Sequence, residues 1–382
     1  MSAQLQRRSA TPPRPARNPG AARGPLWLQP GLQELLDQRL PVSQRLPDLR
    51  DENRWVDVQL GDRVHRLAQP ITFTPYASAQ PCSARCRFCS EALRPDFAGP
   101  IAAKLRPGPG YFQGLATALS LLTAVPLSWS LSGLESTDDI DWMLQLLGVL
   151  SAAESAGLSV ESRVLYSNLA GFSGTRAEAL IQALHSFGLG WIEVSRHHHD
   201  GARNQAIMRF RDGLGVVDND GFRATVRKLD ARLRYKLVCV VQRGGVDSVD
   251  ELLAYLDWAL AHGAEQVIFR ELARMDGAYL PNSTSRYVAQ QRIDIGDLLA
   301  RCLQRRAFAD RWLPRRVTRG YYFSNIVLAE EGGREIVFEA ADYGDMHQRH
   351  DSDRVYKLIY FANGELAADW QPGRRTLWTF DG

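Results

Sequence analysis

The chain has 382 residues, of which 45% are hydrophobic, so it is long enough to bury a substantial core. Its net charge of +3 at pH 7 is too small to indicate a nucleic-acid partner by itself. No apolar run reaches the roughly 18 residues that a membrane-spanning helix needs, so we expect neither a nucleic-acid nor a membrane partner.

The first segment, residues 1–24, differs in composition from the rest of the chain. It contains many Arg, Pro, Ala and Gly residues and no acidic residue. Such a segment buries too little apolar surface to offset the entropy lost on ordering, so we interpret it as a disordered tail. An organellar transit peptide is the alternative, although the prolines oppose the amphipathic helix that such signals form.

Residues 25–69 are interpreted as a small N-terminal unit. The pattern predicts a short helix over 32–40 and two short strands within 54–67, joined by a turn at Gly61 and Asp62. A buried strand over 70–75 then runs directly into a cysteine-containing loop.

From residue 70 onward, strand patterns alternate with helical patterns. Six strands are predicted, over 70–75, 127–131, 160–166, 191–194, 235–241 and 266–269. The predicted helices that separate them cover 111–123, 138–156, 176–187, 202–211, 222–233 and 249–262. This alternation indicates βαβ units and a parallel sheet, but six strands are fewer than the eight of a complete barrel. We place this α/β unit at residues 70–285.

The last segment, residues 286–382, loses this alternation. A helix is predicted over 293–308, and short strand patterns follow from residue 316 onward. Asn363 and Gly364 give a strong signal for a two-residue hairpin. We therefore interpret 317–378 as a small antiparallel sheet that caps or abuts the α/β unit.

Three cysteines in the loop after the first strand carry the most specific signal. Cys82, Cys86 and Cys89 form the pattern C-x3-C-x2-C. Three thiolates this close together can hold three irons of a cubane [4Fe–4S] cluster and leave the fourth iron open. A structural zinc ion would need a fourth ligand, for which the histidines at 197–199 are a source in principle. Disulfides are disfavoured because the chain has five cysteines, an odd number, and no secretory signal.

This spacing, with Phe88 directly before the last cysteine, resembles the radical S-adenosylmethionine (SAM) superfamily. The resemblance covers roughly residues 70–272 and implies a partial (β/α)6 TIM-like barrel. It also implies a [4Fe–4S] cluster on the three cysteines, with SAM bound at the open iron next to Phe88. Such enzymes cleave SAM reductively, abstract hydrogen from a substrate, and take their electron from a donor such as flavodoxin or ferredoxin. Cys239 and Cys302 are interpreted as core residues, so a single cluster is expected.

Candidate SAM-binding residues follow the next strand ends, where the active sites of such barrels gather. Gly133 and Glu135 match the Gly-Gly-Glu motif of the family, whose carboxylate receives the amino group of SAM, while Leu134 replaces the second glycine. Without the cysteines, this segment would be an ordinary turn and helix cap. Asn168 is a candidate for the ribose or carboxylate of SAM, with a strand-end turn as the alternative.

The fourth and sixth strands end in further candidates. In the family, a polar residue at the position of Ser195 and Arg196 meets the ribose or the carboxylate of SAM, and a solvated arginine at the barrel rim is the alternative for Arg196. The histidines at 197–199 cannot all face one point, so we expect one of them, for which we take His198, to contact the substrate or donate a proton. Glu271 is the second catalytic candidate, and a structural pair with Arg270 is its alternative.

We expect a cytoplasmic radical SAM enzyme that acts on a small polar metabolite in a biosynthetic pathway. A reducing compartment suits free thiols and an oxygen-sensitive cluster. One alternative is modification of a ribosomally made peptide, with the C-terminal sheet docking the peptide by strand addition. A non-catalytic iron–sulfur or zinc scaffold is the other.

Overall fold

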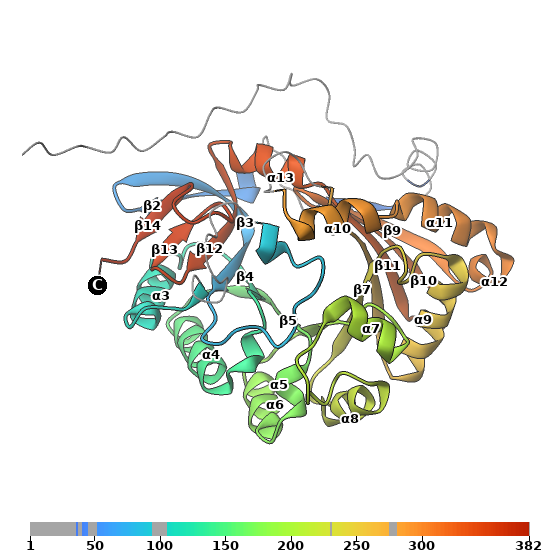
Figure 1. The fold of residues 1–382 in the computed structure, drawn as a ribbon. Coiled ribbons are helices and arrows are strands. Elements are labelled where there is room, and N and C mark those ends of the chain that lie inside the picture. Colours follow the sequence, from blue (N-terminus) through green and yellow to red (C-terminus); the bar gives the residue numbers. More distant parts are fainter. Residues whose placement is uncertain are drawn as a thin grey trace, which may run out of the picture.

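The computed structural model describes residues 36, 40–44, 52–93, 105–229, 231–274 and 281–381. The expected tail and most of the expected helix over 32–40 lie outside these ranges. The described strands form one sheet that curves into an open barrel, with helices on its outer face (Figure 1). Within these ranges, no helix combines the length and the apolar character needed to cross a bilayer.

Six parallel strands form the centre of the sheet and follow one another in chain order, as the alternating pattern predicted. They are β3 (Arg63–Tyr76), β4 (Leu127–Leu131), β5 (Val160–Ser167), β6 (Trp191–Ser195), β7 (Tyr235–Val241) and β8 (Gln266–Glu271). β7 shows why these segments form strands, because its run of Leu, Val and Cys residues is β-prone and almost wholly buried.

Helices connect these strands and cover the outer face of the sheet. They are α3 (Tyr111–Ser120), α4 (Ile140–Ser155), α5 (Ala170–Ser173), α6 (Ala177–Ser186), α7 (Gly201–Met208), α8 (Asn219–Leu229) and α9 (Val249–Ala261). Side chains cap three of them. Asp139 accepts from the Trp142 N–H at the start of α4, Asp200 from the Arg203 N–H at the start of α7, and Ser248 from the Glu251 N–H at the start of α9. The main hydrophobic core lies between these helices and the sheet.

The N-terminal elements are β1 (Val42–Gln44), the 3-10 helix η1 (Glu52–Arg54) and β2 (Trp55–Leu60). β2 pairs antiparallel with the first half of β3 through the predicted turn, where Gly61 adopts a φ of +60°. β3 continues without interruption to Tyr76, so the two strands predicted on either side of residue 69 are one strand.

The C-terminal elements are α10 (Ser283–Gln291), α11 (Ile295–Gln304), α12 (Arg306–Ala309), β9 (Leu313–Arg319), β10 (Phe323–Ala329), β11 (Glu335–Ala341), α13 (Tyr343–His350), β12 (Arg354–Phe361), β13 (Glu365–Ala367) and β14 (Thr376–Thr379). β9 pairs antiparallel with β10, β10 with β11, β12 with β13, and β13 with β14. This agrees with the prediction, as does the hairpin at Gly364.

The C-terminal antiparallel strands belong to the barrel sheet itself, where we expected a small sheet that caps or abuts the barrel. β11 pairs in parallel with β8, and β12 pairs in parallel with β3, so the C-terminal strands extend both edges of the barrel sheet. The physical reason is that an open six-stranded sheet leaves backbone N–H and C=O groups unpaired at each edge. Helices α10 and α13 were not predicted, because few of their residues are apolar and buried.

Candidate active site

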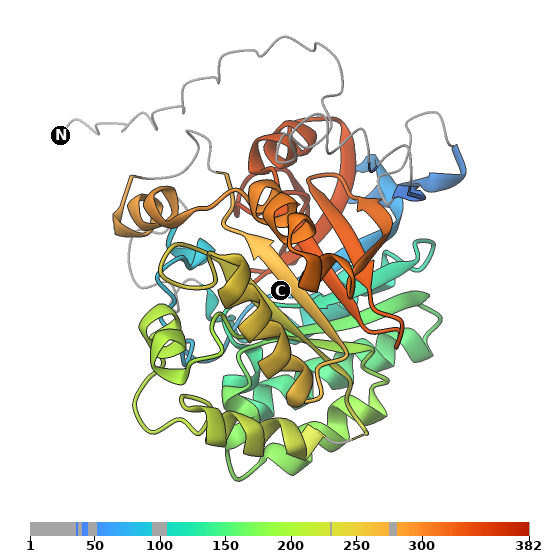
Figure 2. The same cartoon turned by 90° about the vertical axis from the view of Figure 1, so that its right-hand side faces the viewer.

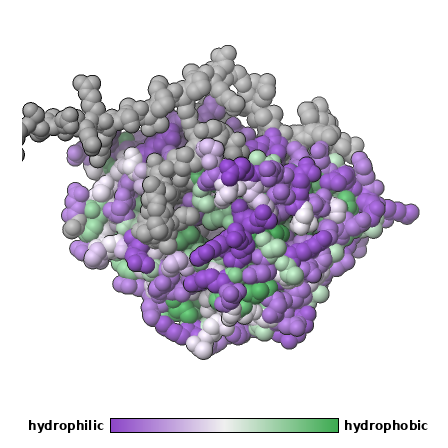
Figure 3. Space-filling view, in the orientation of Figure 1, coloured by the Kyte–Doolittle hydropathy of each residue, from purple (hydrophilic) through white to green (hydrophobic). Residues whose placement is uncertain are grey.

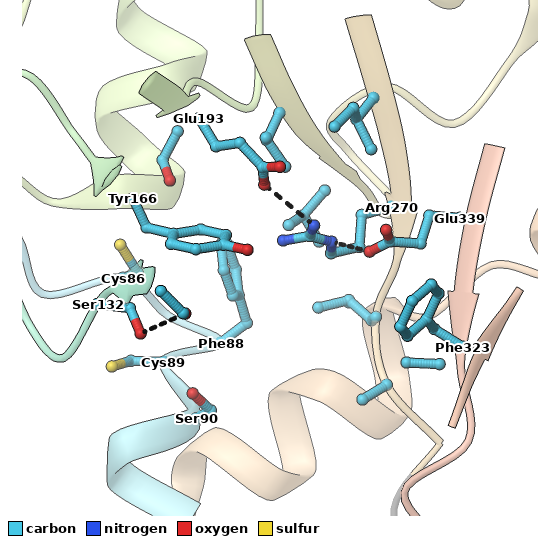
Figure 4. Close-up of a pocket in the computed structure, with 18 of the residues that line it drawn as sticks. Cys86, Phe88, Cys89, Ser90, Ser132, Tyr166, Glu193, Arg270, Phe323 and Glu339 are labelled. Atoms are coloured by element: carbon cyan, nitrogen blue, oxygen red, sulfur yellow. Dashed lines mark hydrogen bonds and ion pairs between the residues drawn. The ribbon is translucent and has the colours of Figure 1, made fainter. Parts of the chain in front are cut away.

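The carboxyl ends of the barrel strands open onto one cavity of about 700 Å³. The short helix η2 (Ser90–Leu93), α7 and α10 lie together at this end of the barrel (Figures 1 and 2). The cavity is lined by the three cysteines and by six of the other predicted site residues, namely Phe88, Gly133, Glu135, Asn168, Ser195 and Glu271. Figure 4 labels Cys86, Phe88 and Cys89 among the residues at the cavity.

Backbone hydrogen bonds hold the cysteine loop against the segment that follows α7. Ala84 forms an antiparallel bridge with Phe210, and the Arg211 N–H donates to the Ser83 carbonyl at 2.9 Å. The Ser83 N–H donates in turn to the Asp138 carboxylate at 2.6 Å. The loop is therefore fixed on both sides, which holds the three thiols at the cavity.

The surroundings of the thiols suit a positively charged metal centre. Burial raises the pKa of the Cys86 thiol to about 12, and Cys89 adds to this effect. Burial, followed by the nearby Glu135 carboxylate, raises the pKa of Cys82 above its ordinary value. Thiols in such surroundings stay protonated unless a metal replaces the proton, and all three are free cysteines.

Three thiols on one short loop match the ligands of a [4Fe–4S] cluster with one open iron, whereas a structural zinc ion needs a fourth ligand. Zinc–sulfur bonds of about 2.3 Å in a tetrahedron bring sulfur atoms to within about 3.8 Å of one another. Among the described residues, the cysteines do not form a group whose ligand atoms all lie within 4.8 Å of one another. The described cysteines are therefore not drawn together to the size of a single zinc site.

Two consecutive left-handed residues shape the turn after β4. Gly133 has a φ of +117°, and a Cβ atom there would lie 3.0 Å from the Tyr76 ring. Leu134 has a φ of +51°, so it adopts the left-handed conformation in spite of its side chain. The departure from Gly-Gly-Glu thus leaves the local turn in place.

The Glu135 carboxylate is buried and held by several donors. It accepts hydrogen bonds from the Thr137 hydroxyl at 2.6 Å, the Ser167 hydroxyl at 2.9 Å and the Asn168 N–H at 2.5 Å. Burial raises its pKa to about 7, and the neighbouring Asp138 carboxylate acts in the same direction. Glu135 also caps the 3-10 helix η3 (Ser136–Asp138), as the alternative of a helix cap predicted, while its role toward SAM stays a prediction.

Asn168 links the end of β5 to the cysteine loop. Its Nδ2 donates to the Ser83 hydroxyl at 2.9 Å and lies 4.0 Å from the Cys82 sulfur. Its Oδ1 accepts from the Ala170 N–H at 2.9 Å, which is the turn bond that a strand-end asparagine forms. The side chain therefore orients the loop that carries the thiols.

Arg196 and His198 do not line the cavity, which contradicts the roles expected for them. Arg196 is buried on the outer side of β6, where it donates to the Val216 carbonyl at 3.0 Å and stacks on the Phe222 ring at 4.6 Å. His198 lies 3.3 Å from the Glu251 carboxylate of α9. The physical reason is that successive side chains alternate in direction, so Ser195 and His197 face the cavity instead.

His198, His199 and Glu251 are close enough together to suggest a metal site. However, the Arg203 guanidinium donates to Glu251 at 2.6 Å, and the Asp200 N–H donates to Nδ1 of His198 at 2.9 Å. Arg203 therefore already supplies the positive charge that a metal ion would bring to Glu251. We interpret this cluster as a polar contact between α7 and α9.

An ion-pair triad crosses the inside of the barrel. Arg270 of β8 pairs with Glu193 of β6 at 3.5 Å and with Glu339 of β11 (Figure 4). Burial lowers the pKa of Arg270, but Glu339 and Glu193 outweigh it, so the net pKa is raised. The alternative pair of Arg270 with Glu271 is wrong, because Glu271 pairs with Arg292.

The triad was missed at the sequence level, although a signal for it exists. Glu193 and Glu339 are single acidic residues inside apolar strand segments, Trp-Ile-Glu-Val and Ile-Val-Phe-Glu. A charge in such a segment is costly unless it is paired or faces a wet cavity. Four side chains from neighbouring strands form an apolar cluster that also lines the cavity, namely Val238, Ile268, Val327 and Val337.

The C-terminal strands supply another wall of the cavity that the sequence did not predict. Lys357 of β12 lines the cavity, as do Asp369 and Trp370 after β13, and the Lys357 ammonium lies 3.8 Å from the Trp370 ring centroid. Asp369 lies 3.6 Å from the buried His350 of α13. These elements are therefore part of the candidate site.

The comparisons with known proteins agree at the level of the fold. No family model matches the chain, and no curated protein matches it by sequence. Streptococcus suis SuiB, solved with S-adenosylmethionine bound, is similar in structure, with 13% identity and a TM-score of 0.50. The match covers 81% of this chain but 63% of SuiB, which is less than two thirds of its length.

Two further structures are similar at lower scores. The enzyme anSMEcpe with bound AdoMet has 11% identity and a TM-score of 0.48, and the match covers 81% of this chain and 77% of that one. TsrM from Kitasatospora setae, a radical SAM methyltransferase, has 14% identity and a TM-score of 0.36 over 53% of this chain and 36% of that one. The open barrel that carries the three-cysteine loop of this chain is thus similar in fold to SuiB, which was solved with S-adenosylmethionine bound.

Proposed function

We propose that this protein is a radical SAM enzyme that acts on a small polar metabolite in a biosynthetic pathway of the cytoplasm. One observation carries the proposal: three free thiols at the end of β3 and the buried Glu135 after β4 open onto the same cavity. In the proposal, Cys82, Cys86 and Cys89 hold one [4Fe–4S] cluster.

The roles of the remaining residues follow from their positions. When bound, the cluster and SAM supply an electron and a carbon radical that can take a hydrogen atom from a substrate. Glu135 and the turn at Gly133 bind the amino group of SAM, and Phe88 and Ser195 line the space beside it. Asn168 holds the loop in place through Ser83.

The interior of the cavity supports a small polar substrate. Its walls carry carboxylates and cations that the barrel strands direct inward, including Glu193, Arg270, Glu339 and Lys357. Paired charges of this kind offer hydrogen bonds in fixed directions, which orient a polar molecule against a reactive centre. Glu271, whose buried Oε2 atom has no hydrogen-bond partner among the residues that the structure describes, remains our candidate for proton transfer.

Cluster loading and SAM cleavage test the proposal. Anaerobic reconstitution should give iron and sulfide in the ratio of one [4Fe–4S] cluster, and addition of SAM and a chemical reductant should release 5′-deoxyadenosine. A triple C82A/C86A/C89A variant should lose both signals. The matched control is C302A, because Cys302 is buried in α11 away from the cavity. If the triple variant still binds iron and releases deoxyadenosine, the proposal is wrong; tightly bound zinc in the wild type would favour a scaffold.

A further inference from the structure

A second group of polar side chains faces the cavity, besides the residues assigned to the cluster and to SAM. It consists of Tyr166, Tyr322 and the ion-pair triad of Glu193, Arg270 and Glu339, and we name it the triad subsite. Tyr166 belongs to β5 and Tyr322 precedes β10, while the triad spans β6, β8 and β11. Both phenols interact electrostatically with all three triad residues, so the two tyrosines lie beside the triad.

The triad subsite keeps polar atoms that no described residue uses. Arg270 donates through Nε to Glu339 and through Nη2 to the Oε2 atom of Glu193 at 3.5 Å. Within the described part of the chain, Nη1 of Arg270, Oε1 of Glu193 and the Tyr166 hydroxyl remain without a hydrogen bond. These side chains line the cavity, and 30% of the Arg270 side chain is accessible. Donors and an acceptor are therefore available to a ligand.

These groups converge on one space. In Figure 4, the Tyr166 hydroxyl and the Arg270 guanidinium point toward each other, and the Glu193 carboxylate lies beside the gap between them. Glu193, together with burial, raises the pKa of Tyr166 well above its ordinary value, so the hydroxyl stays protonated and able to donate. A ligand oxygen in this gap could bond to the phenol and the guanidinium at once. The gap opens onto the same cavity as the three thiols.

The charges around the subsite balance one another. The two triad carboxylates share Arg270, and Lys236 of β7 interacts electrostatically with Glu193, so these four groups carry no net charge. Arg316, which also lines the cavity, pairs with Glu335 at 2.6 Å. A ligand bound here therefore needs no charge of its own. Ionised groups still form stronger hydrogen bonds to a hydroxyl than neutral groups do.

Aromatic and apolar side chains form the remaining walls. Phe88 and Phe323 line the cavity together with the two tyrosines and the apolar cluster described above. Such walls suit a ring that has C–H groups on its faces and polar groups around its rim. On the described surface in Figure 3, hydrophilic side chains predominate and hydrophobic ones form small patches, so this face offers little to a large apolar ligand.

We infer that the triad subsite binds the hydroxyl groups of a neutral, ring-shaped polyol of the sugar or cyclitol class. This inference rests on the proposed function and names its substrate class. Oε1 of Glu193 accepts a hydrogen bond from one hydroxyl, while Nη1 of Arg270 and the Tyr166 hydroxyl donate to hydroxyl oxygens. An amine would be placed next to the guanidinium, and an acid next to the carboxylates, and such like-charge contacts oppose binding.

A matched set of six-membered ring compounds tests the inference. D-glucose and myo-inositol are neutral, D-glucosamine carries an amine, and D-glucuronate carries a carboxylate. Binding to the anaerobically reconstituted protein, with SAM present and without reductant, is measured by ligand-detected NMR. We expect at least one neutral compound to bind about fivefold or more tightly than either charged compound.

A phenylalanine substitution locates the binding. Y166F removes the hydroxyl and keeps the ring, so affinity for the neutral compound should fall about fivefold, as expected for one lost hydrogen bond. The matched control is Y111F, because Tyr111 is buried in the main core and does not line the described cavity. Its affinity should stay within about twofold of the wild type. E193Q replaces Y166F if that variant does not fold.

Three outcomes would overturn the inference: tighter binding of a charged compound, equal affinity in wild type and Y166F, or no binding of either neutral compound. Release of 5′-deoxyadenosine with dithionite, measured without any polyol, is the separate test of the proposed function. Polyol binding requires neither reduction nor SAM cleavage. Loss of cleavage with intact polyol binding would therefore overturn the proposed function, whereas normal cleavage without the neutral preference would overturn this inference alone.

Discussion

Single residues at the cavity show how local environment decides chemistry. Glu135 is an ordinary glutamate in sequence, but burial raises its pKa to about 7 and three neighbours donate hydrogen bonds to it. His197 and His198 are adjacent, yet one faces the cavity and the other contacts Glu251. At this scale, the direction of a side chain matters more than its identity.

The raised pKa of Glu135 has a consequence for stability. The carboxyl group has a higher pKa in the folded chain than its ordinary value of 4.5, so ionisation favours the unfolded chain. The folded state should therefore lose up to about 3 kcal/mol of stability as pH rises from about 4.5 to about 7, with no further change above.

This pH dependence is measured by urea unfolding of the wild type and of E135Q at several pH values. The glutamine cannot ionise, so the slope of stability against pH should be smaller in E135Q over this range. The same substitution at the exposed Glu161 should leave the slope as it is in the wild type. Equal slopes in wild type and E135Q would show that the group does not titrate in this range.

Neighbouring elements are joined inside the barrel by charge as well as by apolar contact. The triad of Glu193, Arg270 and Glu339 connects β6, β8 and β11, and so ties a C-terminal strand to the central strands. Among the described ion pairs, Arg270 is the cation that Glu193 and Glu339 share. Its removal leaves two like charges facing each other.

We expect R270M to lower the free energy of unfolding by about 2–4 kcal/mol, because it leaves two carboxylates without their counter-ion. The triple variant R270M/E193Q/E339Q should recover most of this loss, since it removes the stranded charges as well. The control R234M should cost less than about 1 kcal/mol, because Arg234 forms an exposed pair. The free energy of unfolding of all three variants is measured with urea. A value for R270M equal to that of the wild type would contradict a structural role for the triad.

The whole molecule is organised around one continuous sheet. The central strands alone would have two open edges, and the C-terminal strands extend both of them. β12 is nearly all buried, and it also supplies Lys357 to the cavity. The boundary between residues 285 and 286, like that at residue 69, stays a prediction about domain organisation.

Deletion of residues 354–382 should therefore destabilise the entire barrel. It exposes the edge of β3 and removes the apolar side of β12 from the core, so we expect loss of the cooperative unfolding transition and aggregation. Deletion of 376–382 is the control, because it removes only the short outermost strand β14. Circular dichroism during heating measures both. A longer deletion that still unfolds cooperatively would show that the C-terminal strands are an independent addition.

The amino-acid sequence by itself determined the six central strands, their helices, and the loop of three cysteines. These features depend on the periodicity and spacing of residues that are close together in the sequence, so they can be recognised without the structure. It also identified Phe88, Gly133, Glu135, Asn168, Ser195 and Glu271, because each follows a predicted strand or belongs to a motif, and the structure places all of them at the cavity.

Only the tertiary structure decided which polar residues meet. It turned Arg196 and His198 away from the cavity, paired Arg270 with Glu193 and Glu339, and brought Asp369 to the site from the last part of the chain. It also attached the C-terminal strands to both edges of the barrel. These outcomes depend on contacts between residues far apart in sequence, where burial and charge pairing act together. A local sequence pattern does not identify the partner in such a contact.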